Sequence, residues 1–197
     1  SALEIMSGYQ YRLRVSGSCV PYVESNAVIL TVTRQAEITQ HPVSATVCET
    51  SPVTFTVNAG LTTSPSYQWE RSTDGGLTWG TIAGANTATY TIALTATADN
   101  GHAFRAVVSS TCGSSVTSFP AYLTVNELPE ITDQPDNVVI CEYGIADFIV
   151  DAGVTTGATY RWQRSDDGGG TWNFLTESAT YFGVSTMNLK VNSTRRI

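Results

Sequence analysis

The chain of 197 residues repeats itself at a single offset. Tryptophans, cysteines and short motifs recur 93 residues further along, so the sequence contains a duplicated unit. A period of this length exceeds that of helical solenoid repeats and is typical of one β-sandwich domain per repeat. The matched positions are Trp69 and Trp162, Trp79 and Trp172, Cys48 and Cys141, and Cys19 and Cys112.

Apolar residues alternate with polar ones inside the repeat. Val53, Phe55 and Val57 fall on one face of an extended segment, and threonines fall on the other. This period of two is typical of an antiparallel strand with one face in water, and no long window has the helical period. Short clusters of Gly, Asn and Asp separate the apolar runs, as turns do. The sequence therefore predicts an all-β fold of tandem antiparallel β-sandwiches.

The offset also predicts how the chain is divided. One complete repeat is expected at 37–126. Residues 1–34 hold counterparts of only the last two strands, and residues 128–197 hold counterparts of all the earlier strands. The spacers at 34–37 and 126–130 are too short to behave as flexible coils, so neighbouring repeats are expected to form a fairly stiff rod.

Three stretches of the repeat carry a family resemblance. They are the Ile-Thr-x-Gln-Pro string at 131–135, the segment from Tyr67 to Trp79 (YQWERSTDGGLTW), and the segment from Val108 to Cys112 (VSSTC). These stretches resemble the immunoglobulin-like repeats of large bacterial surface proteins and gliding adhesins, and the resemblance covers the whole chain. It implies immunoglobulin-like sandwiches, an extracellular or cell-surface location, and a structural or adhesive role. The resemblance names no ligand, and the partners we expect for such a role are neighbouring repeats, further copies of the chain, surface glycans or other cell-surface proteins.

Trp69 and Trp162 stand in the middle of alternating strands. A large aromatic residue at such a position is usually buried, and the central tryptophan of an immunoglobulin-like core packs against the opposite sheet. We therefore predict both to be core residues rather than a platform for stacking on carbohydrate. Trp79 and Trp172 are expected to be more exposed.

A second motif, Ser-x-Asp-x-Gly-x-Thr-Trp, occurs at 72–79 and again at 165–172. The same pattern is found in the Asp-boxes of sialidase-like propellers, but a propeller would need a much shorter repeat period. Asp and Gly form tight turns, and Ser and Asp side chains hydrogen-bond to the turn backbone. The motif therefore predicts a hairpin turn in each repeat, formed by Asp74 with Gly75 and by Asp167 with Gly168.

The sequence offers little for catalysis. Its only histidines are His41 and His102, and neither recurs at the repeat offset as a general base would. The acidic residues do not have the spacing of a calcium loop, so a calcium site at Asp133 and Asp136 is a minor alternative. We predict a protein that is not an enzyme and needs no cofactor or metal.

The four cysteines contain no Cys-x-x-Cys pair, which disfavours zinc binding and thioredoxin-like chemistry. Cys48 lies just ahead of the second strand of its repeat and Cys112 just after the penultimate strand. In an immunoglobulin-like sandwich these elements face each other, so a Cys48–Cys112 disulfide and an oxidising compartment are expected.

The partial repeats at the two ends are complementary. With a four-residue insertion between Leu175 and Met187, the next strand of the last repeat would start at position 198. Two arrangements remain open. In the first, the opening segment of one copy completes the last repeat of another in a head-to-tail filament, with a disulfide between Cys19 and Cys141. In the second, the missing strands lie further along one longer polypeptide.

Charge and hydropathy exclude two kinds of partner. The net charge is −7 and the arginines are scattered, whereas nucleic acid requires a concentrated basic face. No apolar stretch approaches the roughly 18 residues of a membrane helix. A carbohydrate-binding accessory module of a secreted glycoside hydrolase remains an alternative, and a row of exposed rings from Tyr67, Trp79 and Tyr122 on one sheet face would favour it.

Overall fold

The computed structural model describes residues 5–193. Almost every assigned element is a β-strand, and a 3-10 turn at Thr97–Asp99 interrupts them. The chain divides into two compact units, unit 1 at residues 1–124 and unit 2 at residues 125–197. The predicted all-β fold is confirmed, whereas the predicted repeat boundaries stay a prediction.

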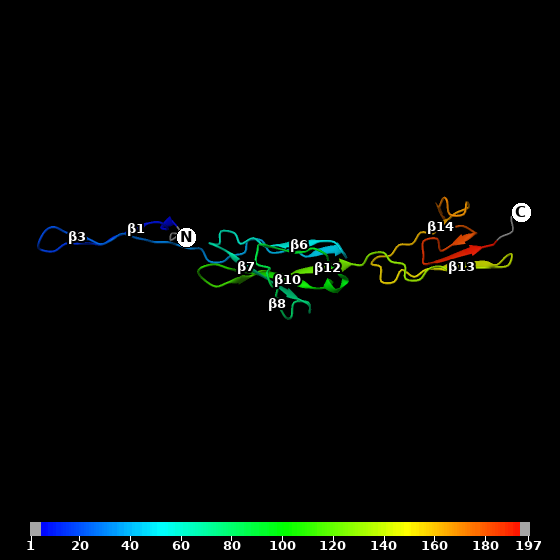
Figure 1. Cartoon of the computed structure of the whole chain (residues 1–197), viewed down its shortest axis with the longest axis horizontal. Coiled ribbons are helices and arrows are strands. Elements are labelled where there is room, and N and C mark those ends of the chain that lie inside the picture. The colour runs from blue at the N-terminus through cyan, green and yellow to red at the C-terminus, as the bar shows by residue number, and fades with distance from the viewer. Residues whose placement is uncertain (1–4, 194–197) are drawn as a thin grey trace. The chain divides into compact units, whose positions relative to one another are not determined.

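Unit 1 begins with a long hairpin, drawn in blue in Figure 1. Its outer pair and its inner pair of strands are both antiparallel. Within the described residues, no strand outside the hairpin is hydrogen-bonded to it. Its strands are β1 (Gln10–Tyr11), β2 (Arg14–Val15), β3 (Val23–Glu24) and β4 (Val28–Ile29), with β1 paired to β4 and β2 to β3.

The rest of unit 1 forms two sheets. The larger has the strand order β5-β12-β10-β7-β8, with β11 also paired to β10, and the smaller contains β6 and β9. The buried residues of both sheets lie between them, so this part is a β-sandwich. The strands are β5 (Ala45–Cys48), β6 (Val53–Thr56), β7 (Ser66–Ser72), β8 (Gly80–Thr81), β9 (Thr89–Ile92), β10 (Ala103–Ser109), β11 (Val116–Thr117) and β12 (Ala121–Asn126).

Trp69 lies at the centre of this sandwich and is fully buried, as the sequence predicts. Its ring approaches Phe55 from the opposite sheet at 6.5 Å between centroids and Tyr90 at 6.0 Å. The indole Nε1 donates to the Thr87 carbonyl at 2.9 Å, which satisfies its polar atom. Phe55 and Phe104, at 4.8 Å, extend the cluster. The alternation read from the sequence thus places its large apolar residues in one core.

Unit 2 repeats part of this architecture. The backbone bond from Val57 to Ala88 recurs as Val150 to Met187, and the indole of Trp162 donates to the Thr186 carbonyl at 2.9 Å. The first partner in each bond shifts by 93 residues but the second by 99. The insertion is therefore six residues, not the predicted four. The strands are β13 (Ile145–Ile149), β14 (Gln163–Arg164), β15 (Asn173–Phe174), β16 (Tyr181–Phe182) and β17 (Asn188–Asn192), paired as β13-β17-β16 and β14-β15.

Unit 2, as described to residue 193, contains no strand equivalent to β10 or β12. Residues 138–141, the counterparts of β5 at the repeat offset, have no strand partner, and Val139 is 98% exposed. Trp162, the second predicted core tryptophan, is only half-buried although its contact with Phe148 at 6.5 Å repeats that of Trp69 with Phe55. The described part of unit 2 therefore lacks the strands that would cover the second side of its core.

Within residues 5–193 the structure contains no helix with the length and apolar character needed to cross a membrane.

Replacing Trp69 by Ala should lower the free energy of unfolding by about 3–5 kcal/mol, because it leaves a large cavity in a closed core. Trp162→Ala is the matched control and should cost clearly less in the monomer, because its ring is partly in solvent already. Urea denaturation followed by circular dichroism measures both. Equal losses for the two variants would contradict this description of the two cores.

Candidate functional site

A groove of about 690 Å³ lies in unit 2 beside Trp162. Val150, Tyr160 and Trp172 also line it. At the repeat offset, residues 160–163 correspond to 67–70 of β7, and in unit 1 these residues are paired with β10. The unit 2 groove is thus the place that a strand equivalent to β10 would fill.

The hairpin of residues 8–32 has the same backbone geometry as the β10–β12 pair. Gly8 N donates to the Leu30 carbonyl at 2.8 Å, and Gly101 N donates to the Leu123 carbonyl at 2.9 Å. The Cα register of Gln10 with Ile29 recurs 93 residues later as Ala103 with Tyr122. The hairpin therefore has the backbone geometry of the strand pair that is missing from the described residues of unit 2.

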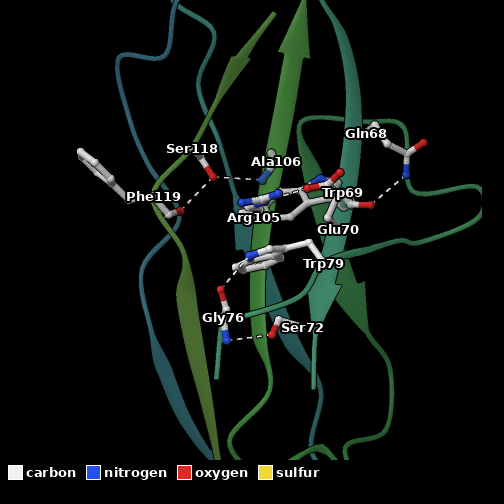
Figure 2. A network of polar contacts seen from close by, with 10 residues as sticks. All are labelled: Gln68, Trp69, Glu70, Ser72, Gly76, Trp79, Arg105, Ala106, Ser118 and Phe119. Atoms are coloured by element: carbon white, nitrogen blue, oxygen red, sulfur yellow. Dashed lines mark hydrogen bonds and ion pairs between the residues drawn. The ribbon is translucent and has the colours of Figure 1, made fainter. Parts of the chain in front are cut away.

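A side-chain hydrogen bond repeats this match. Ser25 Oγ accepts from Leu13 N at 3.0 Å, just as Ser118 Oγ accepts from Ala106 N at 2.9 Å (Figure 2). In both places the same hydroxyl lies 2.9 Å from the carbonyl of the next residue, to which it donates. The two strand pairs are therefore equivalent in side-chain as well as backbone geometry.

The apolar face of the hairpin is exposed where its counterpart is buried. The residues on this face are 44–64% exposed, whereas the residues at the same positions of β10 and β12 are 0% exposed. Nothing in the described residues covers this face with a second sheet. The exposed residues are Tyr11, Leu13, Val15 and Val28, and their buried counterparts are Phe104, Ala106, Val108 and Ala121.

The predicted turn at Asp74 and Gly75 is present. The carboxylate of Asp74 accepts from the Ser72 hydroxyl at 2.6 Å and from the backbone N–H groups of Leu77 and Thr78. These bonds, the one from Ser72 foremost, hold the pKa of Asp74 well below its usual range. Gly75 has φ +74°, a conformation that glycine adopts without strain.

The same turn recurs in unit 2. The carboxylate of Asp167 accepts from the backbone N–H of Thr171 at 2.9 Å and from the Ser165 hydroxyl at 2.7 Å, and both bonds lower its pKa. Gly168 has φ +74°, identical to Gly75. Both motifs therefore act as structural turns.

Glu70, Trp79 and Arg105 form a cluster on the outer face of the larger sheet, which sequence reasoning did not identify. Figure 2 shows the Arg105 side chain over the Trp79 ring, with its guanidinium carbon 4.1 Å from the ring centroid and its Nε 2.7 Å from the Glu70 carboxylate. Trp79 Nε1 donates to the Gly76 carbonyl at 3.0 Å. The indole is half-buried, and this arrangement holds it in one orientation.

The three rings proposed as a carbohydrate platform do not share a face. Tyr67 lies on the same side of β7 as Trp69, toward the core, because side chains alternate along a strand. Tyr122 lies opposite Ala103. A Cβ at Gly76 would lie 3.6 Å from the Tyr122 hydroxyl and 3.7 Å from the Trp79 ring, so both side chains lie beside this turn. Two of the three rings therefore remain together on the outer face.

The structure does not form the predicted Cys48–Cys112 disulfide, and all four thiols are free. Cys48 lies at the end of β5, and its carbonyl accepts from the hydroxyl of Thr95, in the segment that leads from β9 into β10. Cys112 follows the other end of β10. Seven strand residues span about 20 Å, whereas the Cα atoms of a disulfide lie within about 7 Å.

The histidines have structural environments. His41 Nδ1 accepts from Phe119 N at 3.0 Å and its ring lies 4.2 Å from the Phe119 ring. His102 Nδ1 lies 3.6 Å from the Oδ1 atom of Asp99. In the part of the chain that the structure describes, no group of three His, Cys, Asp or Glu side chains has a metal-binding arrangement. Asp133 is instead bridged to Asp151 through the backbone.

Sequence comparison connects the central part of the chain to known proteins. A family model described as Domain of unknown function (DUF8696) matches residues 39–127. Endoglucanase C of Cellulomonas fimi is 36% identical over 102 residues, which are 51% of this chain and 9% of that protein. The chain thus spans less than a tenth of the length of this relative.

Structural comparison shows the fold. An I-band fragment of titin has a TM-score of 0.57 at 15% identity, covering 83% of this chain and 57% of that one. The extracellular domains 3–5 of Drosophila OTK have a TM-score of 0.50 at 14% identity, covering 94% and 61%. The fold is therefore that of tandem immunoglobulin-like domains.

Asp74→Asn should lower the melting temperature at pH 7, because the amide loses the charge that the turn donors stabilise. The folded pKa of Asp74 is below that of an unfolded aspartate, about 3.9. The stabilisation is therefore complete above that pH and is lost as the pH falls through the folded pKa. Melting curves from pH 2 to 7 should show the gap to wild type narrowing below about pH 4. Asp136→Asn, outside the turn, is the control, and a gap independent of pH would contradict the expectation.

Proposed function

We propose that this chain is a non-catalytic structural or adhesive segment of an extracellular bacterial surface protein. The tandem immunoglobulin-like fold fits this role. We further propose that it assembles head-to-tail, with the hairpin of residues 8–32 from one copy filling the unit 2 groove of another. The repeat boundaries in this assembly are those predicted from the 93-residue offset. The repeat that begins at residue 128 is then completed by strands from a second copy.

The observation that carries the proposal is the match between the hairpin and the β10–β12 pair. Both have the same register and the same hydrogen bonds, yet only one is covered by a second sheet. Full burial of an exposed Val or Leu side chain contributes about 1.5–3 kcal/mol, and a side chain that is already partly buried contributes correspondingly less. Leu13 and Val28, both 64% exposed, are two such side chains.

Assembly would also give hydrogen-bonding partners to the unpaired strand edges of unit 2. Residues 138–141 would pair with the incoming equivalent of β12, as β5 does in unit 1. Residues 159–162, of which the structure assigns no strand, would pair with the equivalent of β10. Strand addition of this kind provides main-chain hydrogen bonds for affinity, while alternate side chains provide specificity. An edge left open would instead promote unspecific association.

Val28 and Ile29 offer a matched test because they are adjacent and both 64% exposed. Val28 stands at the position of the buried Ala121, whereas Ile29 stands at that of the outward-facing Tyr122. Val28→Asp should abolish concentration-dependent association in sedimentation velocity, because it would bury a charge. Ile29→Asp should leave association nearly unchanged.

Other results would overturn assembly between copies. A wild-type chain that stays monomeric at all concentrations would contradict assembly between copies. Equal loss of association in both variants would indicate unspecific apolar contact. Neither result would contradict the structural role of the repeats.

A second candidate function is a carbohydrate-binding accessory module, favoured by the similarity to part of Endoglucanase C. Trp172 is 58% exposed and Trp79 half-buried, at equivalent turns of the two units. If this function holds, the protein should bind an insoluble glucan in a pull-down assay, and Trp172→Ala should reduce the bound fraction. Leu77→Ala, at an 84% exposed residue of the first turn, is the control.

A further inference from the structure

The loop after β10 packs against the end of the hairpin. Cys112 Sγ donates to the Thr33 carbonyl at 3.4 Å. The neighbouring Gly113 lies so close to Gln35 that a Cβ there would be 2.8 Å from its side chain. The segment at 34–37 is itself anchored, since Arg34 N donates to Thr63 Oγ1 and Glu37 N to Thr62 Oγ1. The Cys112 thiol is thus held beside Thr33, which directly follows the hairpin of residues 8–32.

The position of Cys48 along the larger sheet follows from the contacts between β12 and the segment that leads into β5. His41 accepts from Phe119 N and Ser44 accepts from Tyr122 N, and both pairs are 78 residues apart. A constant separation means that β5 runs parallel to β12, so Cys48 is level with the last residue of β12. That level is the equivalent of Thr33 at the repeat offset. The Cys48 side chain is exposed there.

Cys141 occupies the same turn in unit 2. The bond from Ser51 N to the Cys48 carbonyl recurs as Gly144 N to the Cys141 carbonyl. Thr50 and Tyr143, which follow at equivalent positions, have φ +63° and +65°. Cys141 is exposed, as Cys48 is. The geometry of the Cys48 turn therefore transfers to Cys141.

From these positions we propose that Cys112 forms a disulfide with Cys141 of a second copy of this chain. The inference rests on the assembly proposed above. When the hairpin of one copy fills the unit 2 groove of another in the β10–β12 register, Thr33 comes level with Cys141 of that copy. Cys112 of the hairpin's own copy already contacts Thr33. Neighbouring strands lie about 4.8 Å apart, so Cys141 comes within one strand spacing of Thr33, the residue that the Cys112 thiol contacts. The Cα atoms of a disulfide lie within about 7 Å of each other.

This pairing differs from both bridges predicted from the sequence. Cys48 and Cys112 lie beyond opposite ends of β10. In the completed repeat, Cys19 at the hairpin tip is likewise separated from Cys141 by the length of the hairpin. The bond joins each repeat to the next rather than closing one repeat on itself, and it would lock the non-covalent assembly.

The chemistry is a thiol–disulfide exchange. The two thiols lose two protons and two electrons to form one S–S bond, and a disulfide oxidant such as glutathione disulfide is reduced to two thiols. Such oxidants are present in the oxidising compartments where surface proteins mature. Both thiols are on exposed or half-exposed residues, so the oxidant has access to them.

The test uses the full chain, mixed as equal parts of ¹⁵N-labelled and unlabelled protein. Sedimentation in the presence of a reductant first measures non-covalent assembly. The mixture is then oxidised with glutathione disulfide, remaining thiols are alkylated, and the protein is cleaved after glutamate. Cleavage at sites including Glu24, Glu49, Glu127 and Glu142 puts the four cysteines on separate peptides. Linked peptides are identified by mass spectrometry.

We expect the Cys112 peptide linked to the Cys141 peptide, with mixed isotope pairs showing that the bond joins two copies. Cys141→Ser should abolish the Cys112 linkage, whereas Cys48→Ser should leave it intact. Assembly with Cys112 fully alkylated, or linked to Cys48, would overturn the inference and leave the proposed function standing. Linkage of Cys141 to Cys19 would do the same. Absence of assembly under reducing conditions would overturn both.

Discussion

The structure depends on strand pairing around β10. In unit 1, β10 is paired on one side with β7 and on the other with β11 and β12, and its inward residues are fully buried. A sheet that lacks this strand has two unsatisfied backbone edges and an open apolar face. Unit 2 lacks this strand within its described residues, whereas the hairpin at the start of unit 1 is a strand pair of the same geometry that no second sheet covers. The same unmet pairing accounts for the groove, the exposed hairpin and the half-buried Trp162.

The turns and the outer-face cluster have a different role. The Asp74 and Asp167 turns are complete in both units, because each is formed by local hydrogen bonds that need no second sheet. The Glu70–Arg105 ion pair, in contrast, needs both β7 and β10. Local features therefore persist in unit 2, whereas features that need an equivalent of β10 are missing from its described residues. This separation explains why the two units share turns but differ in their cores.

The positions of the cysteines show why the disulfide expected from the sequence does not form within one repeat. Two cysteines on facing elements suggest a bridge across one sandwich. The parallel run of β5 beside β12 instead places Cys48 at the far end of the sheet from Cys112. Position along a strand matters as much as the strand itself, since a disulfide tolerates only a few ångströms of separation. A bond within the repeat exceeds that limit, and the proposed bond to the next repeat was placed to meet it.

The sequence by itself determined the all-β class, the 93-residue repeat, the Asp-Gly turns and the central place of Trp69, because each follows from local alternation or from turn chemistry. The tertiary structure decided the six-residue insertion, the partial exposure of Trp162, the outward cluster of Trp79 and Arg105, and the positions of the thiols. These depend on strand register and on which strands are neighbours. Register is set by contacts between residues far apart in the chain, and a single sequence does not specify those contacts.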